Sequence, residues 1–540
     1  MVIRALLKRN TYYDSITLMS VAQAVKDLPG VEDIGAVMAT EANRELLQNS
    51  GLLPVTFLDQ QKPPPGPEDV LIAIRAIDEA HAQNALTVAE ERLTSRGDRA
   101  TPSDTTTVPV RSLEMALRYD EMANLAVISV AGEYAWLEAE QALRHGLHVF
   151  LFSDNVPIEQ EQRLKALAVS KGLLLMGPDC GTAIINGVGL GFSNVVSRGS
   201  IGIVGASGTG MQQLMCLIAA AGRGISQAIG TGGRDLSEAI GGVMTRSGLE
   251  LLANDPQTKV IVLVSKPPAE QVAREILTAA QIDKPVVAVF LGAAPEQFVE
   301  AAGKAHLAWT LTEGAERAVS LLDGYSHRVP GRYDLHKDKD RLLEEYTQLA
   351  FSRQTLSQRF IRALYSGGTL CDEIMLLLAE RLGPIASNIP LRPEWALAAG
   401  ETFRGHTALD LGSDEFTRGR PHPMIDPTLR LQYLSRAAED SETAVILLDI
   451  VLGFCSHPNP AAIYAPAIAQ ARARATAAGR HLPVIVSLCG TEGDPQRLSL
   501  QRAALEDAGA FVYESNLAAA LAAALFVSES GDDLADILQV

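Results

Sequence analysis

A unit that recurs along most of this chain constrains its fold more than any other feature. Each copy is a short apolar run, then a loop with Gly, Ser or Pro, then an amphipathic helical stretch, as in 125–130 followed by 133–145. The runs Val260–Val264 and Val445–Leu448 are apolar without alternation, as a parallel strand covered on both faces requires. The repeated unit therefore predicts an α/β protein built from several doubly wound parallel sheets, Rossmann-like and flavodoxin-like.

The same pattern predicts how the chain divides into domains. A chain of 540 residues is long enough for three or four domains, at about 150 residues for each. The first 95 residues alternate strand-like and helical stretches and predict a small N-terminal α+β domain of β-α-β-α-β order. The predicted boundaries are 1–95 for this domain, 108–197 for a Rossmann domain, 198–325 and 359–530 for two flavodoxin-like domains, and 326–358 for a linker helix.

Composition excludes several classes of partner. The 46 Lys and Arg and 64 Asp and Glu give a net charge of −18, which disfavours nonspecific binding to nucleic acid or to a membrane surface. Five scattered cysteines without a CxxC pair predict no disulfide framework, and no spacing of His, Cys and carboxylates predicts a metal site. We find no signal peptide and no run near the membrane-spanning length of about 18 residues. We therefore expect a soluble, cytoplasmic protein.

The strand-to-helix turn at 205–210 is the strongest candidate for an anion site. Ser207 and Thr209 can cap the helix that follows, while Gly208 and Gly210 let a ligand approach the backbone. The N-terminus of a helix favours negative charge, so a phosphoryl group or another oxyanion fits this turn. The turn matches neither the dinucleotide nor the Walker fingerprint. The alternative is a tight turn that needs glycine only for packing.

Other turns have the same character. The segment 230–235 places Gly233 and Arg234 on a glycine-rich loop, and Tyr365–Leu370 is another strand–glycine–helix sequence. A third turn contains Gly453 and His457 and follows the strongest apolar run. Ordinary loop chemistry explains any one of these turns, but together they favour a shared cleft that binds phosphate.

The densest polar segment runs from Asp410 to Asp426. Arg418 and Arg420 offer guanidinium groups that suit a carboxylate or phosphate, and His422 can exchange a proton near neutral pH. The alternative is a surface loop whose arginines pair with Asp414 and Glu415.

Four segments carry a resemblance to a known family: Gly177-Pro-Asp-Cys-Gly181, Gly205-Ala-Ser-Gly-Thr-Gly210, Gly232-Gly-Arg-Asp-Leu236 and Arg420-Pro-His-Pro-Met-Ile-Asp426. Together they resemble the FdrA family, which is itself similar to succinyl-CoA synthetase. The resemblance implies that 108–197 is CoA-binding-like, that 198–325 is an α-type ligase domain and that 359–530 is a β-type one. It breaks where the synthetase has a Gly-His-Ala-Gly segment, because this chain reads Gly292-Ala-Ala-Pro-Glu. With no residues left for an ATP-grasp domain, ATP-driven CoA ligation by this chain is not expected.

The family resemblance implies a transferase: a subunit of oxamate carbamoyltransferase that works with two further subunits in allantoin breakdown, a branch of purine catabolism, and supplies carbamate kinase. Phosphate would attack oxalurate and release oxamate and carbamoyl phosphate. We expect Ser207–Gly210, Gly453 and His457 to bind phosphate, and Arg234, Gly233 and Arg418 to bind substrate. Arg418 or Arg420 would clamp the oxamate carboxylate, and His422, with Asp426 as its orienter, would exchange the proton. No cofactor is expected on this interpretation.

Two alternatives remain open. The first is an acyl-CoA synthetase-like enzyme that handles CoA or an acyl phosphate, with CoA or ATP as a co-substrate and a CoA site in 132–154. The second is a non-catalytic scaffold whose N-terminal domain contacts partner subunits. A homo-oligomer is compatible with each interpretation.

Overall fold

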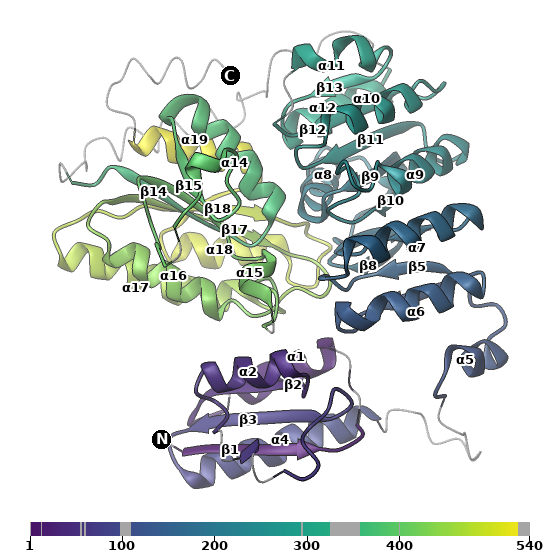
Figure 1. Ribbon diagram of the computed structural model, residues 1–540. Helices are drawn as coiled ribbons and strands as arrows, with labels where there is room; N and C mark the ends of the chain where they lie inside the picture. The colour runs from purple at the N-terminus through teal and green to yellow at the C-terminus, as the bar shows by residue number, and fades with distance from the viewer. Residues whose placement is uncertain are drawn as a thin grey trace. The chain divides into compact units, whose positions relative to one another are not determined.

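The structure, a computed structural model, describes residues 2–324 and 357–527, except 12, 14, 27, 55–56, 59–60, 98–109, 293–294, 399 and 419. The described strands form four sheets (Figure 1). The chain divides into two compact units, of which the first contains residues 1–123 with the short segments 129–135 and 418–421, and the second contains the remainder.

The N-terminal sheet is antiparallel and has the strand order β1-β3-β2. Side chains alternate across β3, so Ile72 and Ile74 pack under α1 and α4 while Leu71 and Ala73 pack against the α2 side. The elements are β1 (Val2–Lys8), α1 (Ser15–Lys26), β2 (Val31–Met38), α2 (Glu41–Asn49), β3 (Val70–Ala76) and α4 (Glu79–Gly97).

A parallel three-stranded sheet of order β4-β5-β6 comes next along the chain. Its elements, with the short helix that precedes them, are α5 (Leu113–Tyr119), β4 (Leu125–Ile128), α6 (Gly132–Arg144), β5 (His148–Leu151), α7 (Ile158–Ser170) and β6 (Leu175–Met176).

The largest sheet has seven strands in the order β13-β12-β11-β9-β10-β7-β8. It is parallel except at one edge, where β7 and β8 form an antiparallel hairpin. Its strands are β7 (Thr182–Ile185), β8 (Val188–Gly191), β9 (Arg198–Ala206), β10 (Ile225–Gly230), β11 (Val260–Ser265), β12 (Val286–Phe290) and β13 (His306–Ala308). Its helices are α8 (Gly208–Ala220), α9 (Val243–Asn254), α10 (Glu270–Ala279), α11 (Pro295–Ala302) and α12 (Leu311–Leu322).

The C-terminal sheet has six parallel strands in the order β15-β16-β14-β17-β18-β19. All nine residues of β17 are buried, as expected for a central strand with helices on both faces. The strands are β14 (Phe360–Tyr365), β15 (Ile385–Ser387), β16 (His406–Asp410), β17 (Thr443–Val451), β18 (Val484–Cys489) and β19 (Phe511–Tyr513). The helices are α14 (Gly368–Leu382), α15 (Asp414–Thr417), α16 (Thr428–Glu439), α17 (Pro460–Ala477), α18 (Leu498–Asp507) and α19 (Asn516–Val527), with a short 3-10 turn η1 (Pro393–Trp395).

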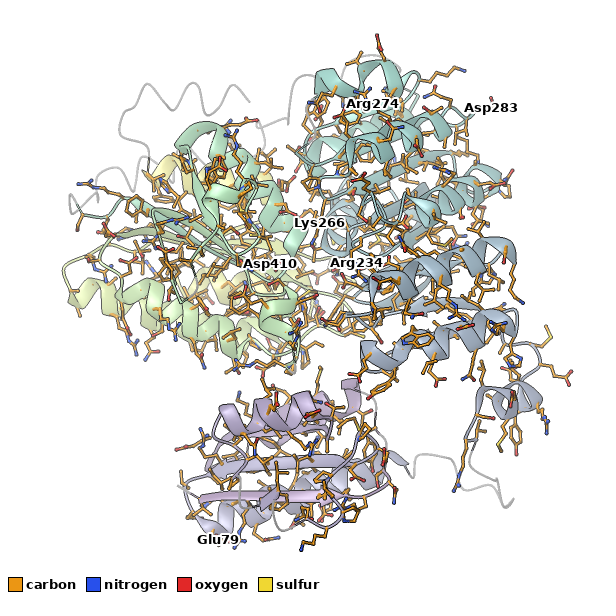
Figure 2. All side chains as sticks on the ribbon, in the orientation of Figure 1. Glu79, Arg234, Lys266, Arg274, Asp283 and Asp410 are labelled. Carbon is orange, nitrogen blue, oxygen red and sulfur yellow. The ribbon has the colours of Figure 1, made fainter. Side chains whose placement is uncertain are left out.

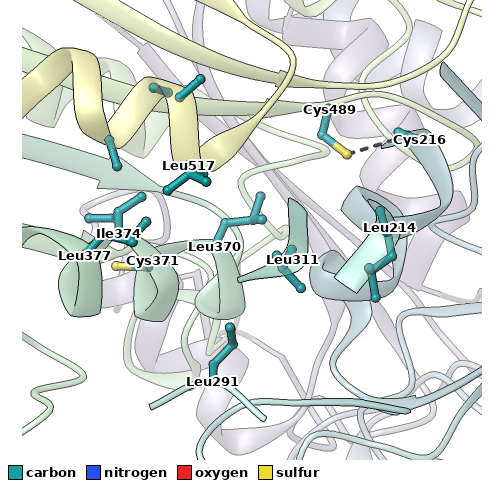
Figure 3. Packing of buried hydrophobic residues seen from close by; sticks show 14 of the residues in the cluster. Leu214, Cys216, Leu291, Leu311, Leu370, Cys371, Ile374, Leu377, Cys489 and Leu517 are labelled. Atoms are coloured by element: carbon teal, nitrogen blue, oxygen red, sulfur yellow. Dashed lines mark hydrogen bonds between the residues drawn. The ribbon is translucent and has the colours of Figure 1, made fainter. Parts of the chain in front are cut away.

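One hydrophobic core joins the seven-stranded and six-stranded sheets. Leu214 of α8, Leu311 of α12, Leu370 of α14 and Leu517 of α19 belong to the same buried cluster (Figure 3). A fully buried leucine contributes about 1.5–3 kcal/mol to folding, so this shared core holds the two sheets together. It also fixes α8 against α14, which positions the site described below.

The predicted fold class is confirmed: several parallel sheets with helices follow a small α+β domain. The domain boundaries stay predictions, and two details differ from what we expected. Strands β7 and β8 precede residue 197 but belong to the sheet of the next predicted domain. The predicted linker helix at 326–358 lies almost entirely outside the described residues. In the part of the chain that the structure describes, no helix has the length and apolarity needed to cross a membrane.

Candidate functional site

Two helix N-termini meet where the seven-stranded and six-stranded sheets adjoin. Helix α8 follows β9 through Ser207, and α14 follows β14 through Ser366 and Gly367. The Ser207 hydroxyl donates a hydrogen bond of 2.7 Å to the hydroxyl oxygen of Thr369, 162 residues away in the sequence. Both side chains are buried, so this bond holds the first turns of the two helices side by side.

The start of α8 is capped by its own sequence. Ser207 has an extended backbone and its hydroxyl accepts the N–H of Gly210 at 3.1 Å. The first four N–H groups of a helix have no partner within the helix. Those of Gly208 and Thr209 find no acceptor among the described residues, so they are free to bind an oxyanion.

The start of α14 is held from a distance. Its N-cap, Gly367, has no capping side chain. The buried Asp449 carboxylate of β17 instead accepts the N–H of Ser366 at 2.8 Å and that of Gly367 at 2.9 Å. Asp449 is in turn paired with the buried Arg430 at 2.9 Å. The next three N–H groups, at 368–370, have no acceptor among the described residues.

Two glycines let the backbone of α14 approach its neighbours closely. A Cβ at Gly367 would lie 2.7 Å from the Thr209 hydroxyl oxygen. A Cβ at Gly368 would lie 2.7 Å from both the Lys266 ammonium nitrogen and Asp410 Oδ2. Glycine at these positions therefore lets Thr209, Lys266 and Asp410 lie directly against the start of α14, closer than a side chain would allow.

Charged side chains lie around Lys266 and the start of α14. Lys266 follows β11, Asp410 ends β16, Asp372 lies in the second turn of α14, and Asp179 follows β6 (Figure 2 labels Lys266 and Asp410). Burial raises the pKa of Asp372 to about 7 and that of Asp410 to about 6, in each case against the opposing effect of Lys266. Asp179 is exposed as a whole residue. Desolvation of its carboxylate by nearby protein atoms nevertheless raises its pKa to about 7.

For Lys266, the effect of the neighbouring charges on the pKa is larger than the effect of burial. Burial acts to lower the pKa of Lys266, but the carboxylates of Asp372, Asp410 and Asp179 outweigh it and raise that pKa above its ordinary value. Lys266 is therefore a permanent ammonium group at neutral pH.

The predicted second phosphate turn, with Gly453 and His457, lies near α8, because Gln212 of α8 donates to the carbonyl oxygen of Leu452 at 3.4 Å. Its part in phosphate binding stays a prediction. The N–H of Gly453 donates to Gln496, the N–H of His457 donates to the carbonyl oxygen of Met424, and Asn459 caps α17. Because these donors are already engaged, we place the second set of open N–H groups at the start of α14. His457 lines a small cavity of about 10 Å³ beside Arg430 and Tyr464, room for no more than one water molecule.

The predicted substrate residues of the loop after β10 lie beside Asp179. A Cβ at Gly233 would be 2.9 Å from Asp179 Oδ2. Arg234, however, pairs with the buried Glu161 at 2.8 Å and donates to the carbonyl oxygen of Val156 at 2.7 Å. Its guanidinium group therefore has structural partners already, which explains its position without a bound substrate.

The structure brings His422 to the site. A Cβ at Gly412 would lie 2.7 Å from His422 Nε2 and 3.2 Å from Asp410 Oδ1. Burial lowers the pKa of His422 to about 4, so the ring is neutral at pH 7. Its Nδ1 accepts the Met424 N–H at 3.3 Å, which assigns the proton to Nε2.

The other members of the 410–426 segment have different surroundings. Asp426, the predicted orienter, accepts the N–H of Thr428 at 2.9 Å and the Thr428 hydroxyl at 2.5 Å. Arg418 and Arg420 are exposed. Their roles as substrate clamps stay predictions.

Our sequence reasoning missed several residues of this site: Lys266, Asp372, Asp410 and Thr369, with Asp449 and Arg430 behind them. A usable signal existed, because Lys266 and Asp410 stand at the carboxyl ends of apolar strands, where ligands of parallel sheets collect. Nothing local marks Asp449, which lies inside a fully buried strand.

Three family models match this chain. They are a CoA-ligase model at residues 364–526, a CoA binding domain model at 196–292, and the model "AllF, heavy metal-associated domain" at 1–109. The first two each contain one of the paired helix starts. The CoA binding model falls on 196–292 rather than on the 108–197 segment that we expected to be CoA-binding-like.

The model that matches the N-terminus is named for a heavy-metal-associated domain. The first cysteine of the chain is Cys180, so residues 1–109 contain no thiol ligand. Among the described residues, no three His, Cys, Asp or Glu side chains are grouped so as to hold a metal ion.

Curated relatives give a consistent picture. The chain is 44% identical to the protein YahF of Escherichia coli K12, over 98% of this chain and 99% of YahF. It is 28% identical to succinate–CoA ligase subunit alpha of Methanothermobacter thermautotrophicus, over 32% of this chain and 58% of that subunit. A solved structure of ATP citrate lyase from Methanothrix soehngenii is 14% identical, covers 79% of this chain and 85% of that one, and has a TM-score of 0.35, too low to inform function.

These comparisons correct the expected reaction class. Relatives that match about a third or more of this chain are named as subunits of CoA ligases, not as carbamoyltransferases, and a CoA-ligase model matches residues 364–526. The expectations of oxamate, carbamoyl phosphate, allantoin breakdown and coupling to carbamate kinase have no counterpart among them, so the transferase assignment is wrong. The alternative of acyl-CoA synthetase-like chemistry matches better.

Proposed function

Because the chain belongs to the family of Escherichia coli YahF and is similar to succinyl-CoA synthetase, we propose that its paired helix ends bind the phosphoryl group of an acyl phosphate or inorganic phosphate. The reaction would be exchange between an acyl phosphate and an acyl-CoA. In it, acyl phosphate and the CoA thiol give the thioester and phosphate, so one acyl–oxygen bond breaks and one acyl–sulfur bond forms.

The observation that carries this proposal is the hydrogen bond between Ser207 and Thr369. It brings two helix N-termini together, and each offers backbone N–H groups without a protein acceptor among the described residues. Two helix dipoles that point at one place favour an anion more than either alone. A tetrahedral phosphoryl group has enough oxygen atoms to accept from both ends.

The exchange suits this chain because it needs no phosphohistidine. The segment after β12 reads Gly292-Ala-Ala-Pro-Glu and lacks the histidine of the synthetase. As the acyl–oxygen bond breaks, negative charge grows on the phosphate, and the N–H groups at Gly208, Thr209 and 368–370 would stabilise that charge.

Asp179 is a suitable group for proton transfer. Asp179 is solvent-accessible and its raised pKa suits proton exchange near neutral pH, so we propose it as the group that takes the thiol proton. His422, with its proton assigned to Nε2, would act as a hydrogen-bond donor beside Asp410 rather than as a base.

Coenzyme A is the co-substrate that the two family models imply, and when bound it would supply the thiol that accepts the acyl group. The fit can be tested within 196–292. The open N–H groups of Gly208 and Thr209 suit a phosphate oxygen, whereas Arg234 already pairs with Glu161. The residues therefore fit a phosphate at the helix end and give no support for Arg234 as its ligand.

The test measures phosphate binding by titration calorimetry and CoA-dependent phosphate release from acetyl phosphate. We compare Thr369→Val with Thr312→Val, whose hydroxyl makes a similar buried bond to Ser515 at 2.9 Å. Loss of one such bond costs about 1 kcal/mol, so Thr369→Val should weaken phosphate binding about fivefold. Thr312→Val should affect stability only. A wild-type chain that binds no phosphate, or equal binding by the two variants, contradicts the proposal.

A further inference from the structure

Lys266 stands out among the charged groups of the second unit. It is only partly exposed, follows β11 directly and lies against the first residue of α14, Gly368. Its ammonium nitrogen makes no hydrogen bond or ion pair with any described residue. An ammonium group in such a place needs a hydrogen-bond acceptor, and an anion that binds the open N–H groups at the start of α14 would supply one.

The titratable groups around Lys266 carry an excess of negative charge. Asp372 and Asp410 face the lysine from α14 and from the end of β16, and Asp179 faces it from the loop after β6. The remaining charged or titratable neighbours of this cluster are Cys371 near Lys266, Asp449 and Arg430 near Asp410, and Asp154, Asp414 and Arg234 near Asp179. One ammonium and three carboxylates would repel a dianion if every carboxylate stayed ionised.

On the basis of the proposed function, we propose that Lys266 binds the phosphoryl oxygens at the paired helix ends, and that Asp372 and Asp410 take up protons when the anion binds. The ammonium attracts the anion, and the protons remove the carboxylate charges that would repel it. Both roles rest on the position of Lys266 and Asp410 against Gly368 and on the carboxylates of Asp372, Asp410 and Asp179 around Lys266.

Proton uptake by Asp372 costs little at neutral pH. Burial already raises the pKa of Asp372 to about 7, so half of the molecules carry that proton at pH 7. The requirement for a proton on Asp372 therefore weakens anion binding only about twofold at pH 7 and about tenfold at pH 8. Asp410, with a pKa raised to about 6, adds to this pH dependence. Anion affinity should accordingly rise as the pH falls from 8 to 6.

The probe is sulfate, a tetrahedral dianion that does not itself titrate in this range, with inorganic phosphate in parallel. Calorimetry of the full chain at pH 7 in buffers with different ionisation enthalpies counts the protons taken up. We expect about 1–1.5 protons for each sulfate bound, about 0.5 at Asp372 and nearly one at Asp410. Lys266→Met should weaken sulfate binding at least about tenfold, and Lys266→Arg should restore most of it, because the charge is kept. Lys259→Met, an exposed lysine beside the start of β11, is the matched control.

A second variant separates the proton from the lysine. Asp372→Asn keeps the shape but needs no proton, so it should bind sulfate about tenfold more tightly than wild type at pH 8 and equally at pH 6. The exposed Asp283→Asn should follow the wild-type profile (Asp283 is labelled in Figure 2).

Three results overturn the inference: a sulfate binding enthalpy that does not depend on the buffer, unchanged binding by Lys266→Met, or no tightening by Asp372→Asn at pH 8. Failure of the proposed function looks different, because wild type would then bind neither sulfate nor inorganic phosphate.

Discussion

The starts of α8 and α14 perform the same task with different support. Their sequences align as Ser207-Gly-Thr209 and Gly367-Gly-Thr369. Ser207 caps α8 by itself. Gly367 has no side chain with which to cap α14, so it depends on Asp449 of β17, 82 residues further along the chain. A serine at position 367 would meet Thr209, since its Cβ would lie 2.7 Å from that hydroxyl oxygen.

The difference shows how close approach and capping compete. Here α14 approaches α8 without a capping side chain of its own, because a side chain at position 367 would collide with Thr209. The helix without a cap then needs a buried carboxylate to hold its backbone. The following predictions test this division between local and distant support, beginning with the largest effect.

Removal of the distant support should be the most damaging change. Asp449→Ala leaves the buried Arg430 guanidinium without its carboxylate and frees the N–H groups of Ser366 and Gly367. We expect a loss of about 3–5 kcal/mol in the free energy of unfolding, measured by denaturant titration. Glu439→Ala, which breaks an exposed pair with Arg474, should cost at most about 1 kcal/mol. Similar losses for both variants would show that α14 does not depend on Asp449.

The two helices should also differ in their response to pH. Asp372 of α14 has a pKa raised to about 7 by burial, above the ordinary 3.8, so the folded state holds its proton where the unfolded state has lost it. Its contribution to stability is complete below pH 4 and is lost as the pH rises through 7. Asp372→Asn should therefore remove a decline of about 1.4 kcal/mol for each pH unit between pH 5 and 6.

The control is the corresponding position of α8, where the neutral Gln212 stands. Gln212→Asn should shift the stability curve without changing its slope. If the curves of Asp372→Asn and wild type are parallel from pH 4 to 7, burial does not hold a proton on Asp372.

The first residues of the two helices should tolerate a methyl group unequally. A Cβ at Gly368 would lie 2.7 Å from the Lys266 and Asp410 side-chain ends, whereas one at Gly208 would meet nothing nearer than 3.5 Å. Gly368→Ala should push those flexible ends away and weaken sulfate binding about tenfold, or about 1.4 kcal/mol. Gly208→Ala should have a smaller effect. Calorimetry on both variants decides this, and a larger loss for Gly208→Ala would reverse the comparison.

Loss of the local cap should have the smallest effect. Ser207→Ala removes the acceptor for the Gly210 N–H and the donor to Thr369. We expect a loss of about 1 kcal/mol in unfolding free energy, the usual cost of removing an N-cap side chain, because the packing of the rest of α8 is unchanged. Thermal unfolding measures it, with Ser112→Ala at the cap of the exposed helix α5 as the control. A loss as large as that of Asp449→Ala would mean that both helix starts need tertiary support.

The turn at 453–457 shows where sequence reasoning reached its limit. It follows a strong apolar run and precedes a helix, just as the turns at 207 and 367 do. What distinguishes it is that Gln496 and Asn459 engage its donors, and Gln496 lies beyond β18, 43 residues along the chain from Gly453. Whether an N–H group stays open depends on side chains that fold against it from elsewhere, so the local pattern cannot separate an open turn from a closed one.

The sequence by itself determined the class of fold, the strand-to-helix turns and the cap at Ser207, because strand burial and helix capping depend on residues only a few positions apart. It also determined that the histidine segment of the synthetase is missing. The tertiary structure alone decided that α14 meets α8, that Asp449 supports Gly367, and that Lys266 lies among three carboxylates. These features join residues up to 162 positions apart, and only the packing of one core between two sheets brings them together.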